Sequence, residues 1–175
     1  SDEFTKNRIR PFQKMKPDLK FLLQHPAHLI ALGFGSGLAP KAPGTFGTLA
    51  GIPLALLLFR LPVVWQAPIL LGMFVLGAWC CDKTGKALGA ADHGSIVWDE
   101  IVAIILVLAF TPMNWLWWLA AFALFRLFDI WKPFPIRQLD AKFKNGFGVM
   151  LDDILAAVYS IVCILALLIW THSIH

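Results

Sequence analysis

Charge is scarce in this chain of 175 residues. Charged residues make up 15% of it and hydrophobic residues 58%, and the mean hydropathy is +0.70. A soluble domain of this size needs more polar surface than such a composition supplies, so this class is excluded. The net charge is only +4. Lysines and arginines lie beside apolar runs, which favours contact with an anionic lipid surface over a nucleic-acid groove.

Cysteine is equally scarce. Cys80 and Cys81 are adjacent, and Cys163 stands inside an apolar run. The chain has neither a CxxC pair nor a Cys-x5-Arg loop, which excludes a thiolate zinc or redox site and a cysteine phosphatase. We interpret the three cysteines as small buried hydrophobic residues.

Five apolar segments approach the roughly 20 residues that a bilayer core of about 30 Å requires. They are residues 45–61, 63–81, 96–110, 115–131 and 154–170. Proline turn signals separate the first segment from the second and the third from the fourth. Residues 18–34 are mostly apolar but are broken at Pro26, which predicts an interfacial helix lying on the membrane.

The sequence therefore predicts an all-α integral membrane protein with about five transmembrane helices and an N-terminal interfacial helix. Residues 1–17 are expected to form a cytoplasmic tail, whose first four residues resemble a cloning remnant. Residues 18–175 are expected to form a single membrane-embedded domain of ordinary size.

The charges are distributed unevenly between the two sides of this topology. If the spans alternate, the amino terminus and the loops 82–95 and 132–150 share one side. Of the 15 lysines and arginines, only Arg60 lies on the other side, while Arg126 lies within the fourth span. The positive-inside rule makes the charged side cytoplasmic. All 11 acidic residues also fall there, which the rule does not require, so we expect an active site at the cytoplasmic face.

A glycine-rich segment, GFGSGLAPKAPGTFGTLAG, leads into the first span at residues 33–51. Its six glycines and two prolines predict a shaped loop that ends where a helix begins. Free amide groups and the helix dipole at such a point favour a phosphate, and Ser36, Lys41 and Thr45 could add donors. Taken alone, the loop is better explained as a flexible entry to the membrane with Thr45 as the helix cap.

Two pairs of adjacent acids each introduce an apolar span. Asp99 and Glu100 close the motif DHGSIVWDE, and Asp152 and Asp153 lie in GFGVMLDDILAA. Burying such carboxylates is costly unless they meet a cation or face a cavity. Neighbouring residues of a helix point about 100° apart, so one acid of each pair can face a shared centre. His93 has no second histidine nearby, which makes it a poor metal ligand candidate.

The segment FRLFDIWKPFPIR closes the fourth span at residues 125–137. Arg126, Asp129 and Lys132 are spaced three apart, which predicts one helical face, and Pro133 should stop the helix. A ladder of ion pairs explains Lys132 well. It explains Arg126 and Asp129 poorly, because they lie deeper among apolar residues, so we favour a functional role for them.

Oxygen ligands without histidine or thiolate suit Mg²⁺, and cations beside such a site suit a phosphoryl group. The residues thus predict a Mg²⁺-dependent enzyme that acts on a phosphorylated lipid headgroup. The predicted catalytic and metal-binding residues are Asp99, Glu100, Asp129, Asp152 and Asp153. The predicted phosphate-binding residues are Arg126, Lys132, Lys41, Thr45 and Ser36.

The glycine-rich segment, DHGSIVWDE, FRLFDIWKPFPIR and GFGVMLDDILAA together resemble segments of the phosphatidylglycerophosphatase A family of bacterial inner-membrane enzymes. The resemblance implies a multi-pass protein that hydrolyses phosphatidylglycerophosphate to phosphatidylglycerol and inorganic phosphate with Mg²⁺, in phospholipid biosynthesis. It implies lipid and no nucleic acid as partner, and a site facing the cytoplasm. The acidic and basic motif positions of the family match this sequence at Asp99, Glu100, Arg126, Asp129, Lys132, Asp152 and Asp153.

Two other functions fit parts of the sequence. A membrane transporter would carry ionisable residues near the midplane and an internal repeat, whereas these spans are apolar at their centres. Another lipid-phosphate phosphatase is the second alternative, although the histidine-based kind needs a histidine pair. The sequence leaves open direct attack by water or an aspartyl-phosphate intermediate.

Overall fold

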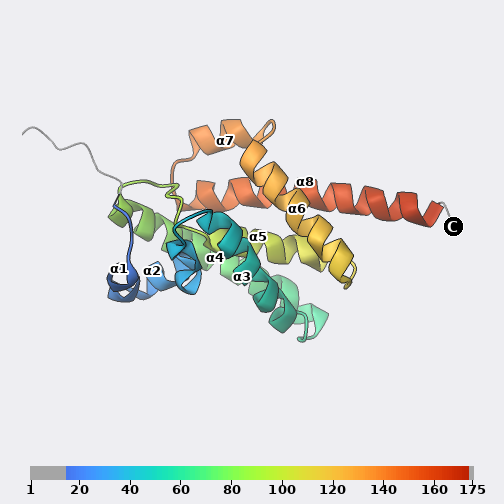
Figure 1. Ribbon diagram of the computed structural model, residues 1–175, viewed down its shortest axis with the longest axis horizontal. Helices are drawn as coiled ribbons and strands as arrows, with labels where there is room; N and C mark the ends of the chain where they lie inside the picture. Colours follow the sequence, from blue (N-terminus) through green and yellow to red (C-terminus); the bar gives the residue numbers. More distant parts are fainter. Residues whose placement is uncertain (1–14, 174–175) are drawn as a thin grey trace, which may run out of the picture.

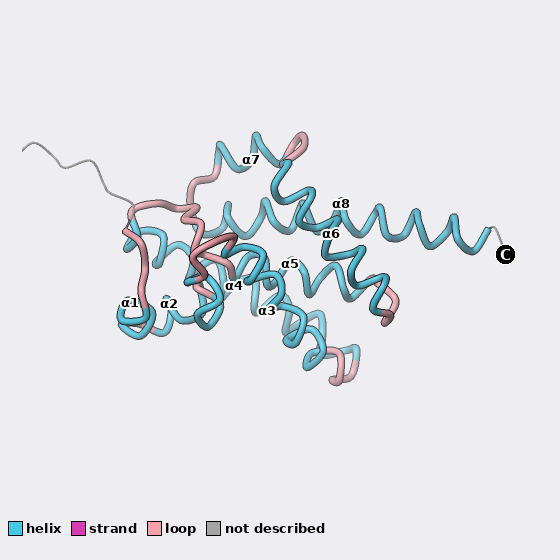
Figure 2. The backbone as a smooth tube through the Cα atoms, in the orientation of Figure 1, coloured by secondary structure: helices cyan, strands magenta, loops and turns pink. Residues whose placement is uncertain are grey.

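The computed structural model describes residues 15–173, and every regular element among them is a helix (Figures 1 and 2). The prediction of an all-α fold is confirmed. Most of the expected N-terminal tail, residues 1–14, and the last two residues lie outside the described part. The elements are α1 (Leu19–Gln24), α2 (Pro26–Ala31), the 3-10 helix η1 (Gly33–Leu38), α3 (Pro43–Leu58), α4 (Val63–Leu88), α5 (Trp98–Ala109), α6 (Trp115–Trp131), α7 (Ile136–Lys142) and α8 (Gly146–Ser173).

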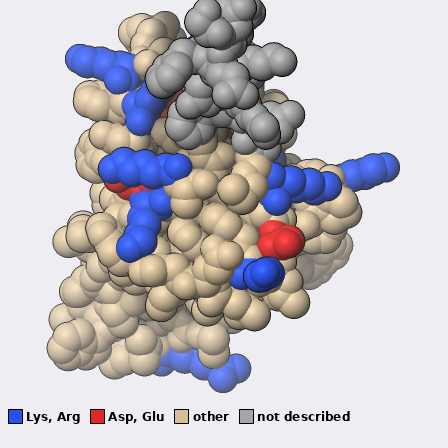
Figure 3. Space-filling model, turned by 90° about the vertical axis from the view of Figure 1, so that its left-hand side faces the viewer, with Lys and Arg blue, Asp and Glu red and all other residues tan. Residues whose placement is uncertain are grey.

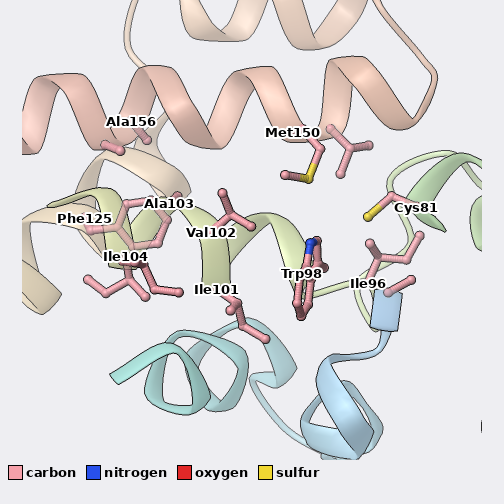
Figure 4. Packing of buried hydrophobic residues seen from close by; sticks show 14 of the residues in the cluster. Cys81, Ile96, Trp98, Ile101, Val102, Ala103, Ile104, Phe125, Met150 and Ala156 are labelled. Atoms are coloured by element: carbon pink, nitrogen blue, oxygen red, sulfur yellow. The ribbon is translucent and has the colours of Figure 1, made fainter. Parts of the chain in front are cut away.

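Helix α5 forms the centre of the molecule. Nine of its 12 residues are buried, and it packs against α3, α4, α6 and α8. Figure 4 shows Ile101 pointing toward α3 and Val102 pointing toward α8, on opposite sides of this helix. A helix that is apolar on all sides belongs in the middle of a bundle. Side chains on the first turn of α5 are therefore held inside the protein.

Helices α4 and α8 are long and apolar enough to cross a membrane. Their most apolar windows have mean hydropathies of 1.8 and 2.5, and only 11% and 22% of those windows are buried in the protein. Large apolar side chains such as Leu71, Val75 and Val162 are exposed on them. The other three predicted spans form shorter helices of 16, 12 and 17 residues.

The N-terminal stretch forms two short helices where one interfacial helix was predicted. His25 is extended between α1 and α2, and its Nδ1 accepts a hydrogen bond from the Ala27 amide. Pro26 then starts α2, where its missing amide hydrogen costs nothing. Helix α2 is fastened to α4 by a hydrogen bond of 2.8 Å between His28 Nδ1 and Thr84 Oγ1.

The glycine-rich segment is only half loop, although its composition favoured a loop throughout; the predicted span from residue 45 begins two residues after the observed helix start. Helix α3 begins at Pro43, and Gly44, Gly47 and Gly51 recur on one of its faces. A Cβ atom on Gly47 would lie 2.4 Å from Val97 Cβ, and one on Gly51 would lie 2.3 Å from Ile104 Cγ2. The glycines are therefore needed because α3 packs directly on α5, as small residues allow between membrane helices.

The charged loops gather at one end of the bundle. The α4–α5 loop, α7 and the start of α8 lie opposite the α3–α4 and α5–α6 turns (Figure 1). Figure 3 looks onto the charged end, where many more basic than acidic side chains are visible. Helices α3, α5 and α8 begin near this end and α6 finishes there, which brings the four sequence motifs together.

Candidate active site

A triad of carboxylates, Asp99, Glu100 and Asp153, lies where α5 begins. Their oxygens come within 4.8 Å of one another, and Asp99 and Asp153 are only 5% and 3% exposed. One oxygen of each, Asp99 Oδ1, Glu100 Oε2 and Asp153 Oδ2, is buried without a hydrogen-bond partner in the described part of the chain. Three such groups repel one another unless a cation lies among them. An oxygen-only set of this kind suits a hard divalent cation.

Arg126 links α6 to this triad. Its Nη1 forms an ion pair with the carboxylate of Asp129 one turn later, and lies 3.7 Å from Glu100 Oε1. Asp129 also lies beside the carboxyl of Asp153. The Nε of Arg126 is buried and has no acceptor within residues 15–173. The guanidinium therefore keeps a free donor next to the carboxylates.

Lys132 does not share a helical face with Arg126 and Asp129, so this part of the sequence prediction is wrong. Helix α6 ends at Trp131, and Lys132 caps it in the left-handed conformation, at φ 48°. Pro133 follows and cannot continue the helix. The Lys132 side chain consequently leaves the line of α6 and reaches another set of partners.

Those partners are three acids around the Lys132 ammonium. Its Nζ lies 2.7 Å from Asp152 Oδ2, 3.1 Å from Asp140 Oδ2 and 3.8 Å from Asp92 Oδ2. Burial lowers the pKa of Lys132, but the hydrogen bond and charge of Asp152 outweigh burial and raise it. Lys132 thus stays protonated. Asp140 was not predicted, because only the fold of α7 back toward α8 brings it here, and Asp92 was read as part of a loop motif.

The two acidic pairs behave differently. Asp153 joins the triad while Asp152 turns to Lys132, which is the division that a 100° step along a helix allows. Asp99 and Glu100 both join the triad. The longer side chain of Glu100 accounts for this, because it reaches back across the step that separates it from Asp99.

The start of α3 touches the same group of residues. A Cβ atom on Gly44 would lie 2.6 Å from Glu100 Oε1 and 3.1 Å from both Nη atoms of Arg126. The helix begins at Pro43 after Ala42, which is left-handed at φ 46°. Thr45 is the third residue of α3, not its cap, and its amide donates to the Ala42 carbonyl. The positive end of the α3 dipole therefore points into the site.

The remaining predicted phosphate ligands lie farther from these contacts. Ser36 Oγ donates to the Gly33 carbonyl at 2.8 Å, inside η1. Lys41 is exposed and forms no ion pair with any residue between 15 and 173. His93 accepts a hydrogen bond from the Ser95 amide through Nδ1. The structure does not hold Ser36 or Lys41 against the carboxylates.

A cavity opens at the charged end beside the Lys132 partners. Its volume is about 460 Å³, and Asp92, Arg137, Asp140 and Lys144 contribute to its lining. Asp92 and Asp140 also surround the Lys132 ammonium. The cavity therefore gives water access to one wall of the site.

The fold and the site define a class: an all-helical, membrane-associated protein with a buried acidic centre lined by cations. Comparison with known proteins agrees. The model of the family described as phosphatidylglycerophosphatase A matches residues 29–168. The chain is 52% identical over 156 residues to Phosphatidylglycerophosphatase A of Haemophilus influenzae, covering 88% of this chain and 96% of that protein. It is 44% identical over 155 residues to the Escherichia coli protein of the same name, covering 87% and 89%.

A third relative carries a different name. A Bacteroides thetaiotaomicron protein, provisionally named a phosphatidylinositol-3-phosphatase, is 44% identical over 144 residues, covering 78% of this chain and 89% of its own length. No solved structure matches the chain significantly. Because the family model covers most of the sequence, the chain belongs to the phosphatidylglycerophosphatase A family.

Proposed function

We propose that this protein hydrolyses the phosphate monoester of phosphatidylglycerophosphate, releasing phosphatidylglycerol and inorganic phosphate in phospholipid biosynthesis. Membership of the family and the names of the two most similar relatives described above support this reaction. One observation carries the proposal in the structure. Arg126, Glu100 of the triad and Gly44 at the start of α3 lie against one another, so a cation, carboxylates and a helix amino terminus meet at one point.

The triad is the proposed binding site for Mg²⁺. The support is its three buried oxygens that lack donors within residues 15–173 and the absence of any softer ligand in the set. Bound there, Mg²⁺ would polarise a phosphoryl oxygen and offset the charge that develops on it. Asp129 and Asp152, which the sequence suggested as ligands, are instead assigned to hold Arg126 and Lys132.

The cations of the site orient the phosphate in this proposal. Arg126 offers its unpartnered Nε–H, and its ion pair with Asp129 fixes the plane of the guanidinium. Such a planar donor binds two phosphate oxygens and favours the transition state as charge grows on them. Helix α3 adds the Gly44 amide and the positive end of its dipole, because Pro43 has no amide hydrogen and the Thr45 and Phe46 amides donate to the Ala42 carbonyl. Lys132 is held by Asp152 at the edge of the site, where Asp140 and Asp92 also face its ammonium.

We further propose five transmembrane helices, α3, α4, α5, α6 and α8, in the bacterial inner membrane. Residues 18–175 would form one embedded domain, with α1 and α2 at the cytoplasmic interface. The exposed apolar side chains on α3, α6 and α8 support lipid contact, among them Leu56, Leu119 and Leu165. Helix α5 can be short because neighbouring helices surround it. Asp153 lies seven residues beyond Gly146, which places it about 10 Å along α8 from the charged end of the bundle.

The experiment is phosphate release by the purified protein in detergent micelles, with and without Mg²⁺. Phosphatidylglycerophosphate should be hydrolysed only with the cation, and Asp153→Asn should abolish release. Asp82→Asn is the matched control, because Asp82 lies at the same end but pairs with Lys86. Release that is equal with and without Mg²⁺ would reject the metal assignment.

A second lipid phosphatase activity is the alternative that a specific relative favours. The Bacteroides thetaiotaomicron protein carries the name of a phosphatase for a phosphoinositide. Phosphatidylinositol 3-phosphate and phosphatidic acid should therefore be assayed beside phosphatidylglycerophosphate. A larger kcat/KM for either of them would replace the proposed substrate while keeping the site.

A further inference from the structure

An apolar groove lies between α3 and α6 on the outside of the bundle. Its volume is about 450 Å³, and its lining is Leu49, Ile52, Trp115, Trp118, Leu119 and Phe122. Both helices pack on α5. The groove therefore faces the surroundings of the bundle and has α5 behind it.

The groove begins at the proposed phosphate site. On α6, Phe122 precedes Arg126 by four residues and Leu119 precedes it by seven, so all three lie on one helical face. On α3, Leu49 and Ile52 line the other wall of the groove, five and eight residues beyond Gly44. At this end the two helices meet, because Gly44 lies against Arg126. The apolar lining thus continues directly from the polar site.

Two aromatic rings meet toward the opposite end of the groove. Phe59, which caps α3, meets Trp118 of α6 edge to face, with ring centroids 6.5 Å apart. Trp115, the lining residue farthest from Arg126, precedes it by eleven residues, so the lining extends about 16 Å along α6. A groove that is cationic at one end and apolar along the rest of its lining matches an amphipathic molecule with an anionic head.

We propose that this groove binds one acyl chain of the lipid substrate while its phosphate monoester lies at Arg126. This inference rests on the proposed function and adds a binding site for the chain. Bulk lipid also covers exposed apolar faces such as that of Leu71 on α4. The α3–α6 groove differs because its lining residues Phe122 and Leu119 share a helical face with Arg126. The acyl chain would then orient the headgroup before hydrolysis.

Filling the groove tests the proposal. Leu49→Trp and Leu119→Trp place large rings in it, and Leu71→Trp is the matched control on α4. Each variant is assayed with diacyl phosphatidylglycerophosphate and with the same headgroup after removal of both acyl chains. We expect kcat/KM for the diacyl lipid to fall about tenfold or more in the groove variants, with the deacylated headgroup and the control unchanged. Equal losses on both substrates, or no loss on the lipid, would overturn the proposal.

A direct measurement separates substrate from bulk lipid. Phosphatidylglycerophosphate with a diazirine in one acyl chain is photolysed with the wild-type protein, and the labelled peptides are mapped. We expect labelling on α3 and α6 that unlabelled phosphatidylglycerophosphate suppresses and phosphatidylcholine does not. Suppression by both lipids alike would show ordinary lipid contact and reject the groove. A wild-type protein that labels in this way without releasing phosphate would refute the proposed function alone.

Discussion

Lys132 at the end of α6 and Asp152 in α8 form an ion pair, with Nζ 2.7 Å from Oδ2. Asp152 is only 4% exposed, so removing the lysine leaves a buried carboxylate without its cation. A buried pair that loses one partner typically costs about 3–5 kcal/mol. The pair also joins the two helices that carry Arg126 and Asp153, which connects its stability to the site.

Lys132→Met should lower the melting temperature in detergent more than Asp152→Asn does. Methionine leaves Asp152, Asp140 and Asp92 facing one another, whereas asparagine keeps an oxygen for the ammonium. The double variant should resemble Asp152→Asn. The measurement is thermal unfolding of all three. Effects that add within about 0.5 kcal/mol would mean that the pair is not coupled.

Neutralising one acid of the triad should stabilise the protein without metal. Asp99→Asn or Asp153→Asn removes repulsion among buried carboxylates, so the melting temperature in EDTA should rise. The same change should remove the stabilisation by Mg²⁺, which is about 2.7 kcal/mol when the free Mg²⁺ concentration is 100 times its Kd. Differential scanning fluorimetry with and without Mg²⁺ measures both. A full Mg²⁺ response in Asp153→Asn would contradict the triad as ligand set.

Gly44→Ala should inactivate the enzyme while it remains folded. The added Cβ would lie 2.6 Å from Glu100 Oε1, so the carboxylate must move. We expect kcat/KM to fall by about tenfold or more, or 1.4 kcal/mol in activation free energy. Gly72→Ala on α4 is the control, because nothing lies within 4 Å of its Cβ position. Equal activity of the two variants would show that the site does not depend on Gly44.

Arg126→Lys separates phosphate binding from a structural ion pair. Lysine keeps the charge that Asp129 requires but lacks the planar fork. We expect about a tenfold loss in kcat, because the contact strengthens in the transition state, with little change in melting temperature. Steady-state kinetics on a short-chain phosphatidylglycerophosphate give the answer. Unchanged kinetics would leave Arg126 as the partner of Asp129 only.

The five-span topology predicts that Asn114 and the end of α8 face the periplasm. Single cysteines at Asn114 and Ser173, in a protein with Cys163 replaced by alanine, should react with a membrane-impermeant maleimide from outside. Cys80 and Cys81 are buried and should stay silent. Reaction of both introduced cysteines only from the cytoplasm would refute the topology.

Much of the helical framework could be predicted from the sequence, because apolar runs and prolines act locally. The five apolar segments became α3, α4, α5, α6 and α8 with shifted ends. The adjacent acids were recognised because carboxylates beside apolar runs need a cation or a cavity. The structure places Asp99, Glu100 and Asp153 together, and their roles as ligands stay a prediction.

Long-range contacts decide the position of Lys132, the inclusion of Asp140 and the helical glycines, which local sequence does not predict. The turn after α6 directs Lys132 to α8 and brings in Asp140, and Tyr159 holds that turn through a hydrogen bond of 2.6 Å to the Phe134 carbonyl. No local spacing encodes such an arrangement. The glycines were read as loop because their composition resembles one. Only the approach of α3 to α5 shows why Gly47 lies within a helix.

The shortness of α5 has a consequence for how the protein responds to its membrane. Its 12 residues span about 18 Å, well below a bilayer core of about 30 Å. Because other helices surround it, matching to bilayer thickness falls on α4 and α8, with 26 and 28 residues. In the proposed topology, thicker or thinner lipid would change the tilt of those two helices. Because α8 carries Asp153, such a tilt would move one carboxylate of the proposed metal site relative to Asp99 and Glu100 on α5.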